Sequence, residues 1–401
     1  MSVVRFLLCV MACVPNGSHA MDADFLGYAK SYLVLQDNAS ITQSNLHSQQ
    51  VELQNVFRAM FNFKMSSGQD LQLHYEVSPT LYNEAETDYA SLATSSKPRY
   101  RIADLEPYIN QSSNQKTQQN LDRLNMQWHL KEGDVTLGRQ AITFGRARMV
   151  NPMDIFLPYE LQALNTEYRI GIDAMRYQHY ASDFSLFDMG VIFGEDGEPE
   201  NSAGFVRHLN SVNGQDFEFL MVQFKQARLY GFGVQSSIAE FGAWFETAYL
   251  SANLALENEK NYWRTSFGID YAFSESIYTM LELHHNGAGT KTSNQYFVNS
   301  ESDAYQKYGV NFLSKNYVLS SLSFTVNPLL SFSNSLVYNI HDHSCLISVS
   351  AEASWSDHHY SQFGLNIGLG DDAYEDASGM HAGSEFGNVP SMLYISVGVY
   401  F

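Results

Sequence analysis

The last ten residues of the chain, Met392–Phe401, alternate strictly between apolar and more polar side chains. Side chains two positions apart lie on the same face of an extended strand, so this alternation predicts a β-strand with one continuous apolar face. The run reaches the terminal residue without a polar cap, whereas strands of soluble sandwiches seldom end so abruptly. The apolar face consists of Leu393, Ile395, Val397, Val399 and Phe401.

The same alternation recurs along the chain in segments of about ten residues separated by turn residues, which is typical of an antiparallel barrel. We expect about 18 strands, or 16 at the fewest, and an even number places both ends of the barrel on the same side. Residues 305–313 also look like a strand, but an odd count would break this parity, so we assign them to a long loop or a strand extension. The predicted strands cover residues 25–35, 50–65, 71–77, 123–130, 134–144, 168–180, 185–194, 203–210, 216–226, 228–237, 239–250, 262–273, 276–284, 316–326, 331–340, 345–355, 360–369 and 391–401.

The composition suits strands that face lipid on one side and water on the other. Charged residues make up 16% of the chain, below the ~25% of ordinary soluble domains, and aromatic residues reach 14%. Beyond residue 20 no stretch approaches the ~20 apolar residues of a transmembrane helix, and a bilayer admits only helices and closed barrels. The sequence therefore predicts an all-β fold, a transmembrane antiparallel β-barrel. A soluble two-sheet sandwich would show the same periodicity, but the strand number and the terminal Phe401 favour the barrel.

Residues 1–20 have the pattern of a cleaved secretory signal peptide. Arg5 supplies the positive charge, Phe6–Val14 forms the apolar stretch, and Ser18-His19-Ala20 is a small-x-small cleavage site. We expect cleavage after Ala20 and a single mature domain, the barrel of residues 21–401. A buried N-terminal helix is one alternative interpretation of this segment.

Charge and cysteine content exclude several classes of function. The formal net charge is −20, and it becomes −21 when Arg5 leaves with the signal peptide, so we expect no nucleic-acid partner, because phosphate contacts need Lys and Arg. Cys345 is the only cysteine of the mature sequence, which excludes an internal disulfide. Cys13 allows a lipoprotein as a further alternative, but modification there would leave the apolar stretch too short.

Histidine pairs raise the question of a metal site. They lie at predicted strand ends, where polar residues are ordinary, so we predict no metal and no cofactor. The chain contains no G-x-S-x-G, H-E-x-x-H, phosphate-binding loop or dinucleotide-binding fingerprint, and we expect no enzyme. The pairs are His284-His285, His341-x-His343 and His358-His359.

Connections between the predicted strands fall into two groups. Tight ones such as Ser274-Glu275 and Asn327-Pro328 alternate with long ones, which predicts short turns at one rim of the barrel and long loops at the other. In such barrels the turns are periplasmic and the loops extracellular. The predicted long loops cover residues 84–119, 145–167, 285–315 and 370–390.

The segment Gly133–Pro158 is the most distinctive part of the chain. Leu137 and Phe144 fall on opposite parities, so a change of register must lie between them. We predict a β-bulge near Gly138, which would turn Arg139 away from lipid. The strand is expected to end at Gly145, and the residues after it predict a long loop with Arg146 and Arg148 near the barrel mouth.

Motifs in this segment resemble those of porin-like proteobacterial barrels, including alginate-export-like ones. The terminal Phe401, preceded by Val399 and Val397, likewise resembles the closing strand that the barrel-assembly machinery recognises. The resemblance implies a channel in the outer membrane of a Gram-negative bacterium, in contact with lipid and lipopolysaccharide. The motifs are Leu137-Gly138-Arg139-Gln140, Phe144-Gly145 and Asn151-Pro152-x-Asp154-x-Phe156-x-Pro158.

A channel for passive diffusion of small polar or anionic solutes, or for export of a polysaccharide, is the leading hypothesis. A barrel-embedded hydrolase and a surface adhesin are the alternatives. We expect the pore constriction to contain Arg139, Arg146, Arg148 and Asp154, although Arg139 and Asp154 would alternatively be structural partners that pin the loop to the wall. Strand parity places on the lumen wall Arg58, Lys64, His74, Glu76, Arg123, His129, Arg264, Asp270 and Glu282.

Overall fold

The computed structural model describes the chain from residue 21 to the terminal Phe401 with several gaps. The predicted signal peptide, residues 1–20, lies outside the described residues. Within the described ranges, no helix is long and apolar enough to cross a membrane. These ranges are 21–37, 49–65, 68–83, 100–105, 107–156, 164–165, 167–252, 260–376 and 379–401.

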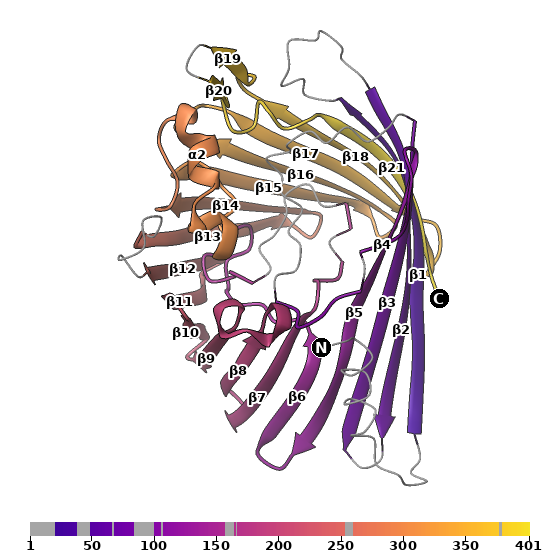
Figure 1. The fold of residues 1–401 in the computed structure, drawn as a ribbon, viewed down its shortest axis with the longest axis vertical. Coiled ribbons are helices and arrows are strands. Elements are labelled where there is room, and N and C mark those ends of the chain that lie inside the picture. The colour runs from indigo at the N-terminus through magenta and orange to yellow at the C-terminus, as the bar shows by residue number, and fades with distance from the viewer. Residues whose placement is uncertain are drawn as a thin grey trace.

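Antiparallel strands form one closed barrel, which Figure 1 shows with the first and last strands side by side. In the described part of the chain, the main sheet has 19 strands, of which β4 is a short strand paired only with β5, and the other 18 form the ring. Closure joins β1 to β21, with Tyr28 opposite Tyr400 and Gln36 opposite Met392. The all-β barrel that the alternation predicts is confirmed.

The strands and helices have the following bounds. The barrel strands are β1 (Met21–Asp37), β2 (Gln49–Met65), β3 (Gln69–Tyr82), β5 (Gln115–Leu130), β6 (Gly133–Gln140), β7 (Ile172–Ser182), β8 (Ser185–Phe193), β9 (Ala203–Val212), β10 (Gln215–Phe224), β11 (Ala227–Ile238), β12 (Phe241–Ala252), β13 (Tyr262–Ser274), β14 (Ile277–Asn286), β15 (Asn316–Asn327), β16 (Leu330–Asn339), β17 (Cys345–Ser354), β18 (His359–Leu369) and β21 (Met392–Tyr400). The remaining elements are β4 (Tyr108–Gln111), β19 (Tyr374–Asp376), β20 (Gly379–His381), α2 (Tyr296–Ser300), α3 (Asp303–Lys307) and the single-turn helices η1 (Glu195–Gly197), η2 (Pro199–Asn201) and η3 (Ser293–Gln295).

The alternation along each strand separates an apolar outer face from an inner face. In β13, for example, Trp263, Phe267 and Phe273 are exposed on the outside, while Arg264 and Ser266 point inward and are buried. This arrangement follows from the period of two along a strand, and a bilayer would cover the exposed apolar side chains. The interior of the barrel is therefore where a functional site has to be sought.

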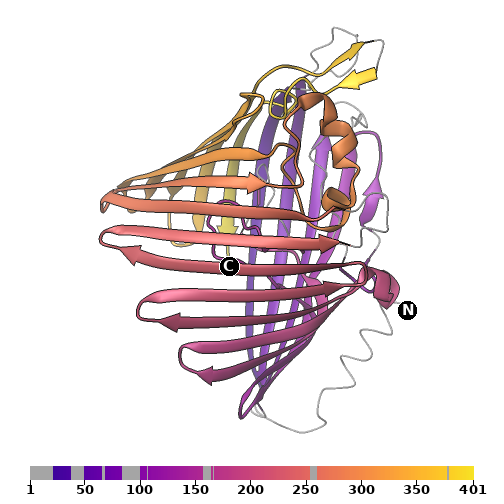
Figure 2. The same ribbon diagram turned by 90° about the vertical axis from the view of Figure 1, so that its left-hand side faces the viewer.

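Tight turns and long connections occupy opposite rims, as predicted. Figure 2 shows the hairpin turns between successive strands at its left and helices α2 and α3 at its right. The turn between β9 and β10 is Asn213-Gly214, with φ of 53° and 75°, the left-handed geometry that such two-residue hairpins require. We call these ends the turn rim and the loop rim.

Two of the predicted segments need correction, and a third agrees with the structure. The strand predicted over 134–144 ends at Gln140, and the one predicted over 168–180 begins at Ile172, because the chain leaves the wall between them. Residues 305–313 form no strand and begin in α3, which agrees with their assignment to a loop.

Strand β6 is much shorter than its neighbour, with 8 residues against 16 in β5. β6 pairs with Leu124–Leu130 of β5, and the part of β5 nearer the loop rim pairs instead with β4, where Asn110 lies opposite Thr117. A second piece of chain thus covers the edge of β5 that β6 leaves free.

Candidate pore constriction

The chain between β6 and β7 enters the barrel. We call residues 141–171 the inner loop, of which 141–156, 164–165 and 167–171 are described. Its first part contacts inward-facing side chains of β10, β12, β13 and β14, and its return segment contacts β1, β2 and β21. The inner loop therefore crosses the lumen from one part of the wall to another.

Glu246 of β12 is the principal anchor of the inner loop. Its carboxylate accepts hydrogen bonds from the backbone N–H groups of Arg146, Ala147 and Met153, at 2.5, 2.9 and 2.9 Å. Glu246 is fully buried. Backbone N–H groups buried away from water need acceptors, and a single carboxylate offers enough lone pairs for three of them.

Glu282 of β14 holds the next part of the loop in the same way. It accepts hydrogen bonds from the backbone N–H of Val150 at 2.8 Å and of Met149 at 3.3 Å. The indole N–H of Trp244 donates to the same carboxylate at 2.7 Å, and Ser266 donates to the carbonyl of Val150 at 2.7 Å. Glu282 was predicted to lie on the lumen wall, and here it fastens the loop to that wall.

Two further buried carboxylates continue this row toward β8. Glu218 of β10 accepts a hydrogen bond from the backbone N–H of Gly145 at 3.1 Å and is paired with Arg207 at 2.7 Å. Asp188 of β8 forms a two-point pair with Arg176, both contacts being 2.7 Å. We call Asp188, Glu218, Glu246 and Glu282 the carboxylate row. Charged hydrogen bonds in a buried setting are strong and directional, so Glu218, Glu246 and Glu282 fix the path of the loop, while Asp188 pairs with arginines of the wall.

Apolar packing seals the loop against the wall on its loop-rim side. Phe144 and Phe156 of the inner loop have ring centroids 5.8 Å apart, and Phe144 also packs against Phe205 of β9. Met153 is fully buried, and its sulfur would lie 2.3 Å from a Cβ at Gly231, so a glycine is needed there. The loop is thus held by polar anchors at one level and by a hydrophobic core above them.

The return segment of the inner loop is tied to β1. Lys30 donates to the side-chain oxygen of Asn165 at 3.2 Å and forms an ion pair with Glu167. Tyr400 donates to Glu167 at 2.9 Å, and Asn165 donates to the hydroxyl of Tyr28 at 2.9 Å. Both ends of the crossing are therefore fastened to the barrel wall.

Arg146 and Arg148 project from the anchored part of the loop toward the turn rim. Their side chains are 23% and 33% exposed, whereas the loop backbone beside them is bonded to Glu246. Arg146 lies 3.4 Å from Asp216, and Arg148 pairs with Asp270 and stacks over the ring of Trp244. These two guanidinium groups are the predicted constriction residues that remain accessible from the lumen.

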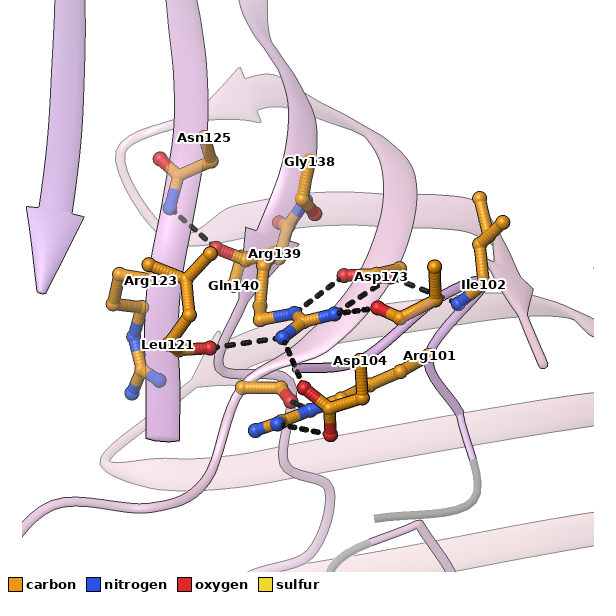
Figure 3. A network of polar contacts seen from close by, with 12 residues as sticks. Arg101, Ile102, Asp104, Leu121, Arg123, Asn125, Gly138, Arg139, Gln140 and Asp173 are labelled. Atoms are coloured by element: carbon orange, nitrogen blue, oxygen red, sulfur yellow. Dashed lines mark hydrogen bonds and ion pairs between the residues drawn. The ribbon is translucent and has the colours of Figure 1, made fainter. Parts of the chain in front are cut away.

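Arg139 is placed differently from Arg146 and Arg148, because it lies within the network of polar contacts that Figure 3 shows. It is 3% exposed and every N–H of its guanidinium group donates a hydrogen bond to the barrel wall or to the segment of residues 103–104. Asp173 accepts at 2.8 and 3.2 Å, Asp104 at 3.0 Å, and the carbonyls of Leu121 and Ala103 at 2.9 and 2.7 Å.

The predicted bulge near Gly138 is wrong. β6 pairs with both neighbours without a register shift, with Gly138 opposite Asn125 and Ala174. The change of parity arises because the chain leaves the wall after Gln140 and packs its next apolar residues inside the lumen. Gly138 is nonetheless required, since its φ is 119° and an added Cβ would lie 2.2 Å from a backbone oxygen of β5.

Asp154, the fourth predicted constriction residue, is buried and pairs with Arg169 at 2.5 Å within the inner loop. The alternative hypothesis, in which Arg139 and Asp154 are structural residues, agrees with their burial. The two do not pair with each other, however, because Arg139 pairs with Asp173 and Asp154 pairs with Arg169. Arg169 also accepts, through its carbonyl oxygen, a 2.7 Å hydrogen bond from Arg123 of β5.

The predicted lumen-wall residues near β2, β3 and β5 form one connected group. Arg58 pairs with Asp122 and lies 3.4 Å from Glu76, and Arg123 lies 2.8 Å from Asp122. His74 is bonded to Asn62 at 3.1 Å. Among the other predicted positions, His129 lies between Asp70 and Asp134, at 3.2 and 2.8 Å, and Lys64 is exposed on the same face of β2 as Asn62. Asp270 pairs with Arg148 of the inner loop. Arg264 donates to the carbonyls of Pro152 and Gly309.

Sequence reasoning missed four acidic residues that hold these groups together. Strand parity alone would have placed three of them inside, because Asp188 and Glu218 alternate with exposed apolar neighbours such as Met189 and Phe219, and Glu246 alternates with less buried residues of β12. Asp122 gives a weaker signal, because it sits at an irregularity where His74 pairs with Arg123 and Tyr75 with Leu121. The missed residues are Asp122, Asp188, Glu218 and Glu246.

The wall from β15 to β17 presents uncharged hydroxyl groups to the lumen. Leu319 of β15 lies opposite Glu282 and therefore on the inner face. Serines at every second position after Leu319 in β15, and the serines paired with them in β16 and β17, lie on that same inner face. Ser333 and Ser350 are 2.6 Å apart and partly cover each other. The set, which we call the serine wall, is Ser321, Ser323, Ser333, Ser335, Ser348 and Ser350.

A second buried carboxylate network joins the loops at the loop rim. Glu385, in the connection between β18 and β21, accepts hydrogen bonds from Tyr317 at 2.5 Å, from Asn339 at 2.9 Å and from the backbone N–H of Leu313 at 2.8 Å. Its own backbone N–H donates to Asp342 at 2.8 Å. Burial, together with the nearby Asp342 carboxylate, raises the pKa of Glu385 to about 7.

This raised pKa predicts that the loop containing Glu385 is held more firmly in acid. The folded state binds the proton more tightly than the unfolded state, whose carboxyl has a pKa of 4.5, so this stabilisation is complete below pH 4.5 and is lost as the pH rises through about 7. Hydrogen exchange of residues 384–389, corrected for intrinsic rates, should be slower at pH 5.5 than at pH 8. Glu385→Gln should abolish that difference, whereas Glu375→Gln, at an exposed position of the same loop, should retain it.

Comparison with known proteins identifies the fold. No protein-family model and no curated protein sequence matches the chain. Acinetobacter baumannii OccAB4 superposes with a TM-score of 0.59 at 8% identity, over 96% of this chain and 100% of that one. The chain has a porin fold. Acinetobacter baumannii OccAB1 (TM-score 0.57, 10% identity, 95% and 96% coverage) and Pseudomonas aeruginosa OccD3 (0.54, 9%, 94% and 91%) share this porin fold, while the alginate-export-like resemblance stays a prediction.

Proposed function

We propose that this protein is an outer-membrane channel through which small polar solutes diffuse passively. The observation that carries the proposal is the inner loop, which crosses the lumen and is fastened at both ends to the wall of a porin fold. A loop fixed inside a barrel narrows the path, and the width and charge of that narrow part would decide which solutes pass. The narrow part is lined with polar groups, which come from Arg146 and Arg148 on one side and from the serine wall on another.

The exposed apolar outer face and the rims of unequal length support a location in the outer membrane of a Gram-negative bacterium. Lipid and lipopolysaccharide would then cover the outer face, with the turn rim toward the periplasm. This part of the proposal would be contradicted if the protein fractionated with the soluble periplasm. Heat-modifiable migration of the membrane fraction on a gel would support it.

Small solutes fit the interior better than a polysaccharide in transit. The inner loop and the connections that carry Tyr308 and Phe386 pack three apolar clusters inside the barrel, and these occupy space that an extended chain would need. Among the side chains that the structure describes, no arrangement favours the hydrolase or the adhesin over the channel.

Conductance of the purified protein in a planar lipid bilayer tests the proposal directly. A channel gives discrete current steps that scale with salt concentration, and polar solutes of increasing size should cross liposomes at decreasing rates. Absence of current and of solute flux from correctly folded protein would overturn the proposal and return attention to a hydrolase or an adhesin.

Removing Arg146 and Arg148 should make the channel more selective for cations. The substitutions would leave Asp216 and Asp270 without these cationic partners. A unit charge about 4 Å from a passing ion in water contributes about 1 kcal/mol, so we expect the ratio of cation to anion permeability to rise about fivefold in the Arg146→Ala/Arg148→Ala variant. Reversal potentials in a salt gradient measure this ratio, and Arg228→Ala, at an exposed site on β11, is the matched control.

Phe401 should matter more for assembly in the cell than for the stability of the folded barrel. Its ring is 55% exposed on the outer face, while its backbone pairs with Gly27 through bonds of 2.8 and 3.0 Å. Phe401→Ala keeps that backbone pairing, so refolding in detergent should be nearly unchanged while insertion into the outer membrane falls. Equal outer-membrane levels of the two proteins would contradict an assembly role.

A further inference from the structure

A separate cavity of about 350 Å³ lies between the return segment of the inner loop and strands β1, β17, β18 and β21. This volume lies within the range that is typical of binding sites for small molecules. Tyr360 and Tyr400 stack in its lining, with ring centroids 5.7 Å apart. An added Cβ at Gly398 would lie 2.2 Å from the Tyr360 ring, so this glycine lets the ring lie flat on β21.

The protein already places one ammonium group at the edge of this cavity. Lys30 is 5% exposed, and its nitrogen lies 4.4, 5.6 and 5.8 Å from the ring centres of Tyr28, Tyr400 and Tyr360. It is also paired with Glu167. Aromatic faces attract cations through their quadrupole, so this arrangement shows that the lining stabilises an alkylammonium group.

The charge of the cavity lining leaves room for a second cation. Lys30 and Glu167 neutralise each other, whereas Glu352 and Asp357 are exposed and make no hydrogen bond or ion pair with any residue that the structure describes. Glu352 lies on the inner face of β17, opposite Gln362 of β18, which also lines the cavity. Apart from its histidines, the lining therefore carries excess negative charge beside aromatic rings.

We propose that this cavity binds a small organic cation of the alkylammonium class. Glu352 would neutralise the positive head, and the rings of Tyr360 and Tyr400 would receive its alkyl groups. The proposal that the cation binds is argued from the lining of the cavity alone. The further idea that this cation is a transported solute rests on the proposed channel function. Neutral polar solutes of the same shape would lack the attraction to both the carboxylate and the aromatic faces.

Choline and its uncharged isostere 3,3-dimethylbutan-1-ol test this proposal as a matched pair. Isothermal titration of the full-length protein in detergent should show choline binding at least about tenfold more tightly than the isostere. Glu352→Gln, at an exposed site that should not affect folding, should weaken choline binding about fivefold. Tyr360→Leu should weaken it as well, whereas Glu240→Gln, in a turn on the opposite part of the barrel wall, should leave it unchanged.

Equal affinity for the two compounds, or unchanged affinity in Glu352→Gln, would overturn the proposal. Heat-modifiable migration confirms that each variant is folded. Conductance separates this proposal from the proposed function: choline binding without any current would disprove the channel and keep the site. Current without choline binding would keep the channel and disprove the site.

Discussion

Replacing Arg139 by alanine should lower the free energy of unfolding by about 3–5 kcal/mol, the usual cost of breaking a buried ion pair by removal of one partner. Asp173, at 2% exposure, would be left as a buried charge, and the carbonyl oxygens of Leu121 and Ala103 would lose their donor. Urea unfolding of the purified barrel in lipid vesicles, followed by tryptophan fluorescence, measures the change. A loss below about 1 kcal/mol would show that the network of Figure 3 contributes little.

Two further variants separate the buried network from the mere loss of an arginine. Arg228→Ala removes an arginine whose contact with Gln223 is exposed, and it should cost less than about 1 kcal/mol. Arg139→Lys keeps the charge but loses the planar set of five donors, so it should remain strongly destabilised. If Arg139→Lys behaved like the unmodified protein, charge rather than hydrogen-bond geometry would be the important property.

Replacing Glu246 by alanine should release the inner loop and raise single-channel conductance. The substitution leaves the backbone N–H groups of Arg146, Ala147 and Met153 buried without their acceptor. Since each unsatisfied buried group costs about 1–3 kcal/mol, the anchored conformation should lose about 3 kcal/mol or more. In single-channel recordings, we expect the variant to give larger and noisier current steps than the unmodified protein.

The control for this experiment is Glu240→Ala, at a turn where the carboxylate has only an exposed contact with Tyr271. Its conductance should equal that of the unmodified protein. Glu246→Gln is informative as well, because the amide retains one acceptor oxygen but places N–H groups against donors of the loop. Unchanged conductance in both Glu246 variants would mean that the apolar cluster around Phe144 and Met153 holds the loop without the carboxylate.

Local periodicity was sufficient to predict the barrel. The strand around Phe267 and the closing strand at Val397 alternate because one face meets lipid, and this physical cause acts on each strand separately. The same rule predicts Arg58, Arg264 and Glu282 on the inner face, and in the described structure all three are buried.

The path of the inner loop could not be predicted from the sequence, because its anchors are distant along the chain. Glu246 contacts Arg146, 100 residues before it, and nothing near either residue records that contact. The partners of Arg139 were missed for a related reason. Its partner Asp104 comes from a segment with no alternation, and a bulge was the simplest local explanation for a change of parity that a departure from the wall produces.

The position of the anchors along the chain has a consequence for how the barrel is built. The inner loop precedes the strands that carry Glu218, Glu246 and Glu282, while its return segment is bonded to Lys30, 137 residues before Glu167. The loop backbone therefore has no acceptors until β10 to β14 arrive, and those strands must close around it. Contacts so remote in sequence slow folding, because the entropy of closing a long loop is lost before the contacts form. We therefore expect folding of the wall and insertion of the loop to be coupled, so that a chain arrested before β14 would have neither a closed wall nor a placed constriction.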